Sequence, residues 1–442
     1  MGEVGGHAFF PSLKGDIELR FEDENITPYA GIYLLREFFR KIRLTRFIRK
    51  LLRVQKRDRY YSTCELFLSV IYAILFGFER MPHTNILGCD RAFLGITGLK
   101  AFPDPSSLWR FLMRLDQDHI AAILRMNQTY LRKMLSIRPG KRVIIDMDST
   151  VLTVYGHQEG AAIGYNPAKP GRPSYHPVCA FLGEEKDFIT GCLRPGDVHS
   201  GKDSVSLFEN ALRAAGAKGC NLRTDSGFYD IELVRYCETS GVKFAIVAKQ
   251  TQPIKRVIYG LKYKEFDRDF SEAEFEYAPV GWTRPRRFVV IRQRLKEKAS
   301  GQMTFFPEER WRYQVIVTNL RSKPRRVWRF YNGRANVENV IKELKLSMNM
   351  EKVPTGSFIA NHGYFQIIMF AYNLLNWLRR LCLSKDQRSW TAKTIRQCLL
   401  WVPGKFTVHG RKKVLSIPES YLYRRAYLSS LEGVQGLKFE AS

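Results

Sequence analysis

Residues 141–150 of the 442-residue chain read Lys-Arg-Val-Ile-Ile-Asp-Met-Asp-Ser-Thr, directly after Pro139-Gly140. Val143, Ile144 and Ile145 are consecutive β-branched residues, a pattern typical of a strand buried on both faces. Successive side chains of a strand point to opposite faces, so Asp146 and Asp148 share one side. The segment therefore predicts a buried strand over 141–148 that presents acidic side chains at its carboxyl end.

Further strands and helices are predicted to alternate downstream of this strand. Strands are expected at 177–182, 188–193, 220–224 and 243–248, with helices at 204–215 and 229–239. This alternation indicates an α/β core with some parallel pairing. Asp225 follows the strand at 220–224, and catalytic groups gather at the carboxyl ends of such strands. Asp148 and Asp225 are thus two acids expected at one edge of a sheet.

A third acid, Glu338, lies in a segment with helical spacing. Residues four and seven apart return to one side of a helix, which places five residues on one stripe: Tyr331, Arg334, Glu338, Lys342 and Lys345. A surface helix with ordinary ion pairs would give the same pattern. Two strand-end aspartates and a helical glutamate can also hold two Mg²⁺ ions, with Mn²⁺ as a substitute, for phosphodiester displacement.

The charge of the chain narrows the choice of partner. Lys plus Arg is 71 and Asp plus Glu is 43, which gives a net charge of +28. Such a field attracts polyanions, and neutralised phosphates release counterions. Nucleic acid is the expected partner. Ribosomal or acidic-membrane partners are the alternatives.

Residues 1–138 are predicted to form a helical, DNA-binding N-terminal region. Apolar residues recur at helical spacing over 32–52, and Lys and Arg fill the other face. A further helix is predicted to start at Pro105-Ser106-Ser107 and carries Trp109. It is equally well interpreted as a recognition helix or as a packing helix.

The rest of the chain divides into four regions. We expect residues 139–249 to form the first part of the core and residues 250–312 to form a β-rich insertion. Residues 313–384 are expected to form the second part of the core, which contains the Glu338 helix. Within the insertion, Trp282 sits in a polar turn among basic residues. It is the tryptophan of this stretch that we expect to stack on an unpaired base, with a place in the core as the alternative. Residues 385–442 form a basic C-terminal region.

Membrane and disulfide-rich classes are not indicated. None of the eight cysteines forms a C-x-x-C pair, and no signal peptide is visible in residues 1–23. The apolar segments 66–76 and 362–381 are interpreted as buried helices, since the first is short and the second contains polar residues. We expect a cytoplasmic protein with no membrane partner.

The spacing Y-(2)-R-(3)-E-(6)-K, present as Tyr331, Arg334, Glu338 and Lys345, resembles the signature of bacterial insertion-sequence DDE transposases. Asp148-Ser149-Thr150 and Asp225-Ser226-Gly227-Phe228-Tyr229 resemble the two aspartate motifs of the same group, and the resemblance covers about residues 139–380. It implies that the core is RNase H-like and interrupted by the β-rich insertion. It also implies binding to terminal inverted repeats, a synaptic homodimer, strand cleavage and transfer into target DNA, in the bacterial nucleoid.

The resemblance also implies residue roles. Asp148, Asp225 and Glu338 would be catalytic and bind metal, Arg334 and Lys345 would grip phosphates, and Tyr331 would pack against the DNA. Asp146 stays open as the first ligand, although Asp148 matches the motif better. An RNase H-like nuclease that cuts without joining, or a catalytically silent DNA-binding protein derived from a transposase, are the alternative functions.

Overall fold

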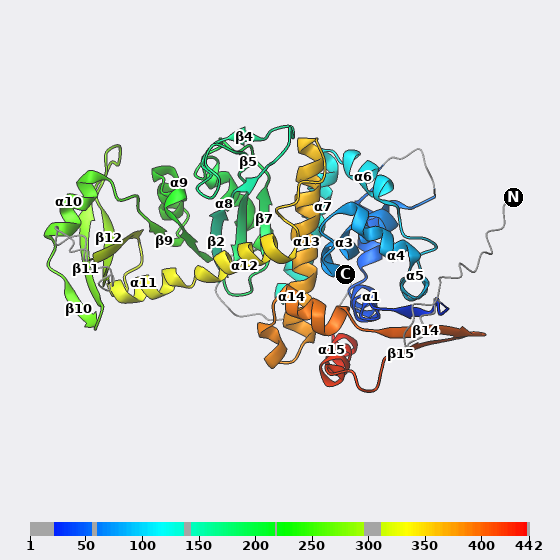
Figure 1. The fold of residues 1–442 in the computed structure, drawn as a ribbon. Coiled ribbons are helices and arrows are strands. Elements are labelled where there is room, and N and C mark those ends of the chain that lie inside the picture. The colour runs from blue at the N-terminus through cyan, green and yellow to red at the C-terminus, as the bar shows by residue number, and fades with distance from the viewer. Residues whose placement is uncertain (1–21, 55–59, 137–142, 217–218, 296–310, 440–442) are drawn as a thin grey trace, which may run out of the picture.

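The computed structural model describes residues 22–54, 60–136, 143–216, 219–295 and 311–439. The predicted border at 138/139 and residues 296–310 of the predicted insertion lie outside these ranges, as does most of the segment inspected for a signal peptide. Within the described ranges the chain is a mixed α/β protein, in which the strands of a large sheet lie, in sequence, between two helical parts. Figure 1 shows these two helical parts together, to the right of the sheet.

The core of the molecule is one mixed sheet, nine-stranded in the described residues, with the order β10-β11-β12-β13-β9-β8-β2-β6-β7. The predicted strand at 141–148 is β2, Val143–Ser149. It pairs parallel with β8 (Cys220–Thr224) and antiparallel with β6 (Val178–Leu182). The outer neighbours are β9 (Lys243–Val247) and β7 (Phe188–Cys192), with helices α8 (Ser204–Ala215) and α9 (Ile231–Thr239) between strands. The predicted alternation is confirmed here.

Residues 250–295 and 311–318 extend the same sheet. Strand β13 (Trp311–Thr318) pairs antiparallel with β9, and β12 (Arg286–Arg294), β11 (Phe270–Tyr277) and β10 (Lys264–Asp267) follow outward. Helix α10 (Gln252–Gly260), where only strands and turns were expected, begins after Thr251 with Pro253 in its first turn. The described part of the β-rich segment therefore adds strands at one end of the sheet (green in Figure 1).

The opposite end of the sheet is strand β7, whose free edge is covered by helix α13 (Phe358–Cys382). Asn373 accepts a hydrogen bond from Phe188 N at 2.8 Å and donates one to Phe188 O at 2.7 Å. Gln366 donates to Gly191 O at 2.8 Å. Unpaired backbone groups of a buried edge need such partners. Helix α13 is buried, as predicted, and its polar residues bond the edge of the sheet. None of the described helices is long and apolar enough to cross a membrane.

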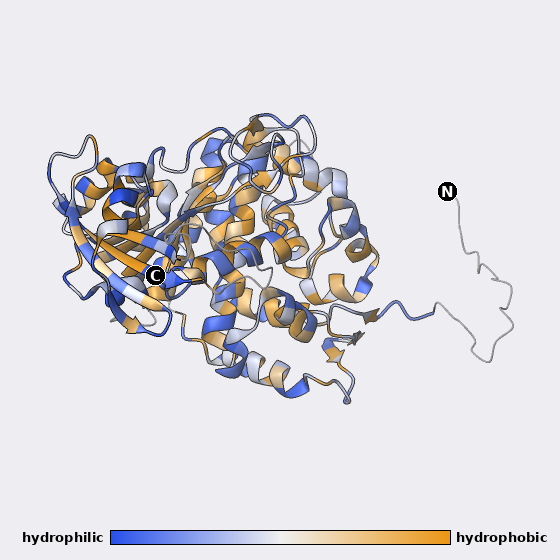
Figure 2. Cartoon of the chain, turned by 60° about the vertical axis from the view of Figure 1, so that its left-hand side comes forward, coloured by the Kyte–Doolittle hydropathy of each residue, from blue (hydrophilic) through white to orange (hydrophobic). Residues whose placement is uncertain are grey.

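The N-terminal region is helical, as expected, but the predicted helix over 32–52 is two helices. Arg43 adopts a left-handed conformation (φ 55°) between α1 (Ile32–Lys41) and α2 (Leu44–Leu51). Asp104 rather than a serine caps α6 (Pro105–Met113). The other helices are α3 (Thr63–Phe76), α4 (Asn85–Cys89), α5 (Arg91–Thr97) and α7 (Gln117–Ser136). Their apolar residues join the core. Figure 2 shows hydrophobic and hydrophilic segments alternating along the helices of the molecule.

The C-terminal region returns to the N-terminal helices. Strand β14 (Gly404–His409) pairs with β15 (Lys412–Ser416) and with β1 (Ile26–Thr27), which closes a small sheet from both ends of the chain. Helix α15 (Arg424–Gly436) packs against α1 and α13. Helices α11 (Pro324–Asn332) and α12 (Ala335–Ser347), with α11 starting earlier than the predicted Gly333, cross from the added strands to the centre of the molecule (Figure 1).

A buried ion pair inside the sheet gives a test of this fold. Arg223 of β8 donates two hydrogen bonds of 2.6 Å to Asp146 of β2, whose side chain is fully buried. Removing one partner leaves the other charge unpaired, so Asp146→Leu and Arg223→Met should each lower the free energy of unfolding by roughly 3–5 kcal/mol. The double variant should lose less than the sum, as measured by denaturant unfolding followed by circular dichroism. Additive losses would contradict the pairing.

Candidate active site

The first candidate residue, Asp148, lies near the carboxyl end of the central strand β2. Its side chain is 9 % exposed, and one of its oxygens accepts a hydrogen bond from Ser149 N at 2.8 Å. The same oxygen lies 2.8 Å from a terminal nitrogen of Arg334. A carboxylate so deeply buried requires a cationic partner, and Arg334 is that partner.

The second candidate residue, Asp225, follows strand β8. Because β2 and β8 are parallel with Met147 opposite Thr224, the residues after these two positions emerge at one edge of the sheet. Asp225 caps the short helix η2 (Ser226–Phe228), and its Oδ1 accepts a hydrogen bond from Gly227 N at 2.9 Å. Its other oxygen lies 3.8 Å from Arg334. The cap fixes the carboxylate beside Asp148.

The third candidate residue, Glu338, stands in the first turn of α12, one helical turn after Arg334. Arg334 donates a 2.8 Å hydrogen bond to Glu338, whose side chain is 63 % exposed. One buried guanidinium therefore contacts carboxylates from two strand ends and one helix. The three acids that the sequence predicted to meet are brought together around Arg334.

Burial and charge shape the titration of this group. Burial raises the pKa of Asp148 to about 7; Arg334 opposes the shift, while Asp225 and Glu338 add to it. Burial lowers the pKa of Arg334, yet the carboxylates, Asp148 foremost, raise it above its ordinary value overall. The arginine is thus held as a cation among carboxylates that repel one another without it.

Asp146, the alternative first ligand, has a different environment from Asp148. It is fully buried and paired through both oxygens with Arg223, which also donates to Phe330 O at 2.8 Å. A Cβ on Gly333 would lie 2.3 Å from the Arg223 guanidinium, so only glycine leaves room for this approach. Asp146 therefore holds the sheet to the end of α11 through Arg223, and both of its oxygens are bonded by Arg223 rather than by Arg334.

The other residues predicted for the site, Lys345, Lys342 and Tyr331, differ in their contacts and burial. Lys345 donates to Val151 O at 2.8 Å and lies 3.7 Å from Glu351, which ties α12 to the segment after β2. Lys342 is exposed on the same helix. Tyr331 ends α11 rather than lying on α12; only 8 % of it is exposed, and burial raises its pKa to about 12. A packing role for Tyr331 against DNA stays a prediction.

Trp282 occupies the turn before β12 and is partly buried. Its ring centroid lies 5.5 Å from that of Tyr229, and the Arg286 guanidinium lies 4.9 Å above it. These neighbours hold the indole against the sheet. Its predicted stacking on a base is not tested by this geometry.

Sequence reasoning did not single out the polar residues beside Asp148. His176 is buried, its Nδ1 lies 2.8 Å from Val198 O, and its Nε2 lies 3.2 Å from the Ser149 hydroxyl. That hydroxyl lies 2.9 Å from the hydroxyl of Ser200. Burial lowers the pKa of His176, which favours the neutral ring. The network fixes the backbone beside Asp148, and its only sequence signal was the polar residue after the aspartate.

The described residues contain no group of three or more His, Cys, Asp or Glu side chains close enough to hold a metal ion as they stand. The Arg334 guanidinium accounts for this separation, because it lies between the carboxylates. The three acids lie close together, and the positive charge that they share is that of Arg334.

The chain was compared with known protein structures, curated proteins and protein families. The chain resembles a piggyBac transposase, solved by cryo-electron microscopy as a synaptic complex with hairpin DNA, with a TM-score of 0.49 and 12% identity over 84% of this chain and 79% of that chain. No curated protein matches the sequence. A family model described as transposase DDE domain group 1 matches residues 10–439. Because that match spans nearly the whole sequence, including the three acids around Arg334, the chain belongs to the transposase DDE domain family.

Proposed function

We propose that this protein is a metal-dependent DNA transposase of a bacterial insertion sequence, which binds terminal inverted repeats, cleaves DNA strands and joins them to target DNA. The observation that carries the proposal is the convergence of Asp148, Asp225 and Glu338 on one guanidinium. Membership of the transposase family supports it. The excess of 71 basic over 43 acidic residues supports DNA as the partner.

The core is proposed to be RNase H-like. In support, the central strand β2 lies between an antiparallel pair, β6 and β7, and two parallel strands, β8 and β9. Strands β10–β13 and helix α11 separate this unit from α12, which is where the expected insertion belongs. The arrangement brings an acid distant in sequence back to the strand ends.

Asp148, Asp225 and Glu338 are the residues proposed to hold two Mg²⁺ ions, or Mn²⁺ in their place. The donor set fits, because carboxylate oxygens suit hard divalent cations and these carboxylates already share a positive group. Bound metal would supply Lewis-acid stabilisation of the phosphodiester displacement. Residues Ser149, Ser200 and His176 keep Asp148 in position.

Arg334, Lys342 and Lys345 are proposed to bind phosphates. A guanidinium that pairs with carboxylates in the free protein also suits the bidentate recognition of phosphate oxygens. Release of Arg334 towards a phosphate would free the carboxylates beside it. From the resemblance, we extend the proposal to a homodimer that pairs the two ends of the element.

Removal of single carboxylates tests the chemistry. Asp148→Asn, Asp225→Asn and Glu338→Gln should each reduce strand cleavage by at least about a hundredfold, because a lost ligand weakens the metal site more than a change in its surroundings does. The measurement follows a labelled duplex that carries the inverted repeats flanking the gene, incubated with Mg²⁺. Glu276→Gln, an exposed acid on β11, should cleave as the wild type does.

Product analysis in the same assay separates the alternatives. Cleavage with joined product supports a transposase, whereas cleavage without joining would indicate the nuclease. Binding without cleavage by the wild type would indicate a silent DNA-binding protein, and full activity of the Glu338→Gln variant would refute the proposed site.

The position of Arg334 predicts metal affinity in the absence of DNA. Arg334→Met removes the cation among the acids, so Mn²⁺ should bind the DNA-free variant about tenfold more tightly than the wild type, since a like charge nearby disfavours cation binding. Titration calorimetry measures this. Arg326→Met removes an exposed charge from helix α11 and should leave the affinity unchanged. Equal affinities for wild type and Arg334→Met would disprove the competition.

A further inference from the structure

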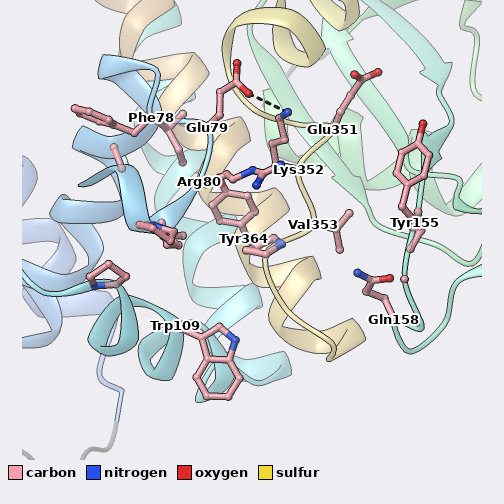
Figure 3. A pocket seen from close by; sticks show the side chains of 18 of the residues that line it. Phe78, Glu79, Arg80, Trp109, Tyr155, Gln158, Glu351, Lys352, Val353 and Tyr364 are labelled. Atoms are coloured by element: carbon pink, nitrogen blue, oxygen red, sulfur yellow. Dashed lines mark ion pairs between the residues drawn. The ribbon is translucent and has the colours of Figure 1, made fainter. Parts of the chain in front are cut away.

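A large cavity lies beside the candidate active site and has no role in the function proposed so far. Its volume is about 1110 Å³, and it opens between the N-terminal helices and the loop that follows β2. Figure 3 shows Phe78, Glu79 and Arg80 on one side and Tyr155 with Gln158 on the other. Trp109 of α6 closes the lower end of this view, and Val353 and Tyr364 lie between the two sides.

Two of the aromatic residues that line this cavity, Trp109 and Tyr155, are exposed. Trp109 is 44 % exposed and Tyr155 is 75 % exposed. The buried residues of α6 are Leu108, Phe111 and Leu112, so the helix packs with one face and presents Trp109 on another. The packing interpretation of α6 is thus confirmed for one of its faces, while a recognition role for α6 stays a prediction. Exposed indole and phenol rings provide flat surfaces on which bases stack whatever their sequence.

The charged residues of the rim favour an anionic ligand. Lys352 is paired with Glu79 at 3.0 Å, and Glu351 lies 3.7 Å from Lys345. Arg80 and Lys169 are exposed and form no ion pair with an acid in the described ranges. The acids of the rim are thus partly neutralised, while two cations remain available for phosphates.

A polar group for base recognition is also present. The Oε1 atom of Gln158 is buried without a hydrogen-bond partner among the described residues. A buried acceptor left unpaired is unfavourable, so rotation of the Gln158 amide towards a ligand that donates a hydrogen bond gains stability. Exocyclic amino groups and ring N–H groups of bases are such donors.

The cavity is close to the candidate acids along the chain. Thr153 lines it and lies five residues after Asp148, so the two are within about 18 Å even in extended backbone. Lys345 of α12 holds this connecting segment through Val151 O. A nucleotide in the cavity would therefore lie a short length of strand away from the reacting phosphate.

We propose that this cavity binds an unpaired segment of the DNA strand being processed, with one base on Trp109 and a neighbouring base on Tyr155, a hydrogen bond to Gln158 and phosphates on Arg80 and Lys169. The inference rests on the proposed function for its DNA partner. A volume above that of most sites for small ligands accommodates the base with its sugar and phosphate. Unstacking of a base next to the cut site is stabilised by such a pocket.

Binding of a labelled duplex with and without unpaired nucleotides tests the proposal. Fluorescence anisotropy in EDTA compares a blunt duplex with the same duplex extended by unpaired thymidines at its 3′ or 5′ end. The wild type should bind one extended form about fivefold to a hundredfold more tightly than the blunt form, as expected for stacked bases. Trp109→Leu and Tyr155→Leu should lose this preference but keep the affinity for blunt duplex.

Control variants keep the result interpretable. Tyr165→Leu changes a tyrosine that is 73 % exposed and lies outside the cavity lining, and it should keep the preference. Trp109→Phe retains a flat ring and should keep most of it. Melting curves establish that each variant is folded. No preference in the wild type, or an undiminished preference in both leucine variants, would overturn the inference.

The same assay separates failure of this inference from failure of the proposed function. Asp148→Asn should keep the preference for the extended duplex, because it alters cleavage and leaves the cavity intact. Cleavage and joining without any such preference would refute the cavity proposal alone. The preference without cleavage by the wild type would refute the catalytic proposal alone.

Discussion

The structure depends on two buried carboxylates that lie two residues apart on one strand. Asp146 and Asp148 share a face of β2, and neither can stay ionised in the interior without a cation. Arg223, from the neighbouring strand, pairs with the first, and Arg334, from the start of α12, pairs with the second. Arg223 also holds the last turn of α11 through Phe330 O. These contacts fix the junction of α11 and α12 on the sheet. Glu338, in the first turn of α12, therefore lies near the strand ends.

The same principle operates at the other end of the core. Strand β7 ends the sheet, and its outward backbone groups are bonded by Asn373 and Gln366 of α13. A second set of buried polar contacts is made by Arg396. It donates hydrogen bonds to Leu75 O at the end of α3 and to Ser347 O at the end of α12. Helix carbonyls that lack partners at a C-terminus bind cations well. Polar contacts of this kind tie the N-terminal helices to the helix that carries Glu338.

Local pattern was enough to predict the elements around the acids. Consecutive β-branched residues identified β2, and the spacing from Tyr331 to Lys345 identified the acid-bearing helix. Long-range features had no local signal. The pairing of β1 with β14, and of β9 with β13, joins segments far apart in sequence, and the left-handed Arg43 that divides the first predicted helix is not a glycine. The partners of Asp146 and Asp148 were likewise invisible, because basic residues are abundant and only the fold selects two of them.

The central position of Arg334 also explains why a conspicuous acidic triad is stable in DNA-free protein. Three carboxylates near one another repel, and one of them, Asp148, is raised in pKa to about 7 by burial and by its acidic neighbours. A guanidinium from the same helix as Glu338 lowers that repulsion and requires no external cation. The three carboxylates cannot all bind a metal ion while Arg334 is paired with them. They become available when the guanidinium pairs with another anion. A DNA phosphate is such an anion, so substrate binding and the opening of the acidic site would be one event, with the guanidinium exchanged between carboxylate and phosphate.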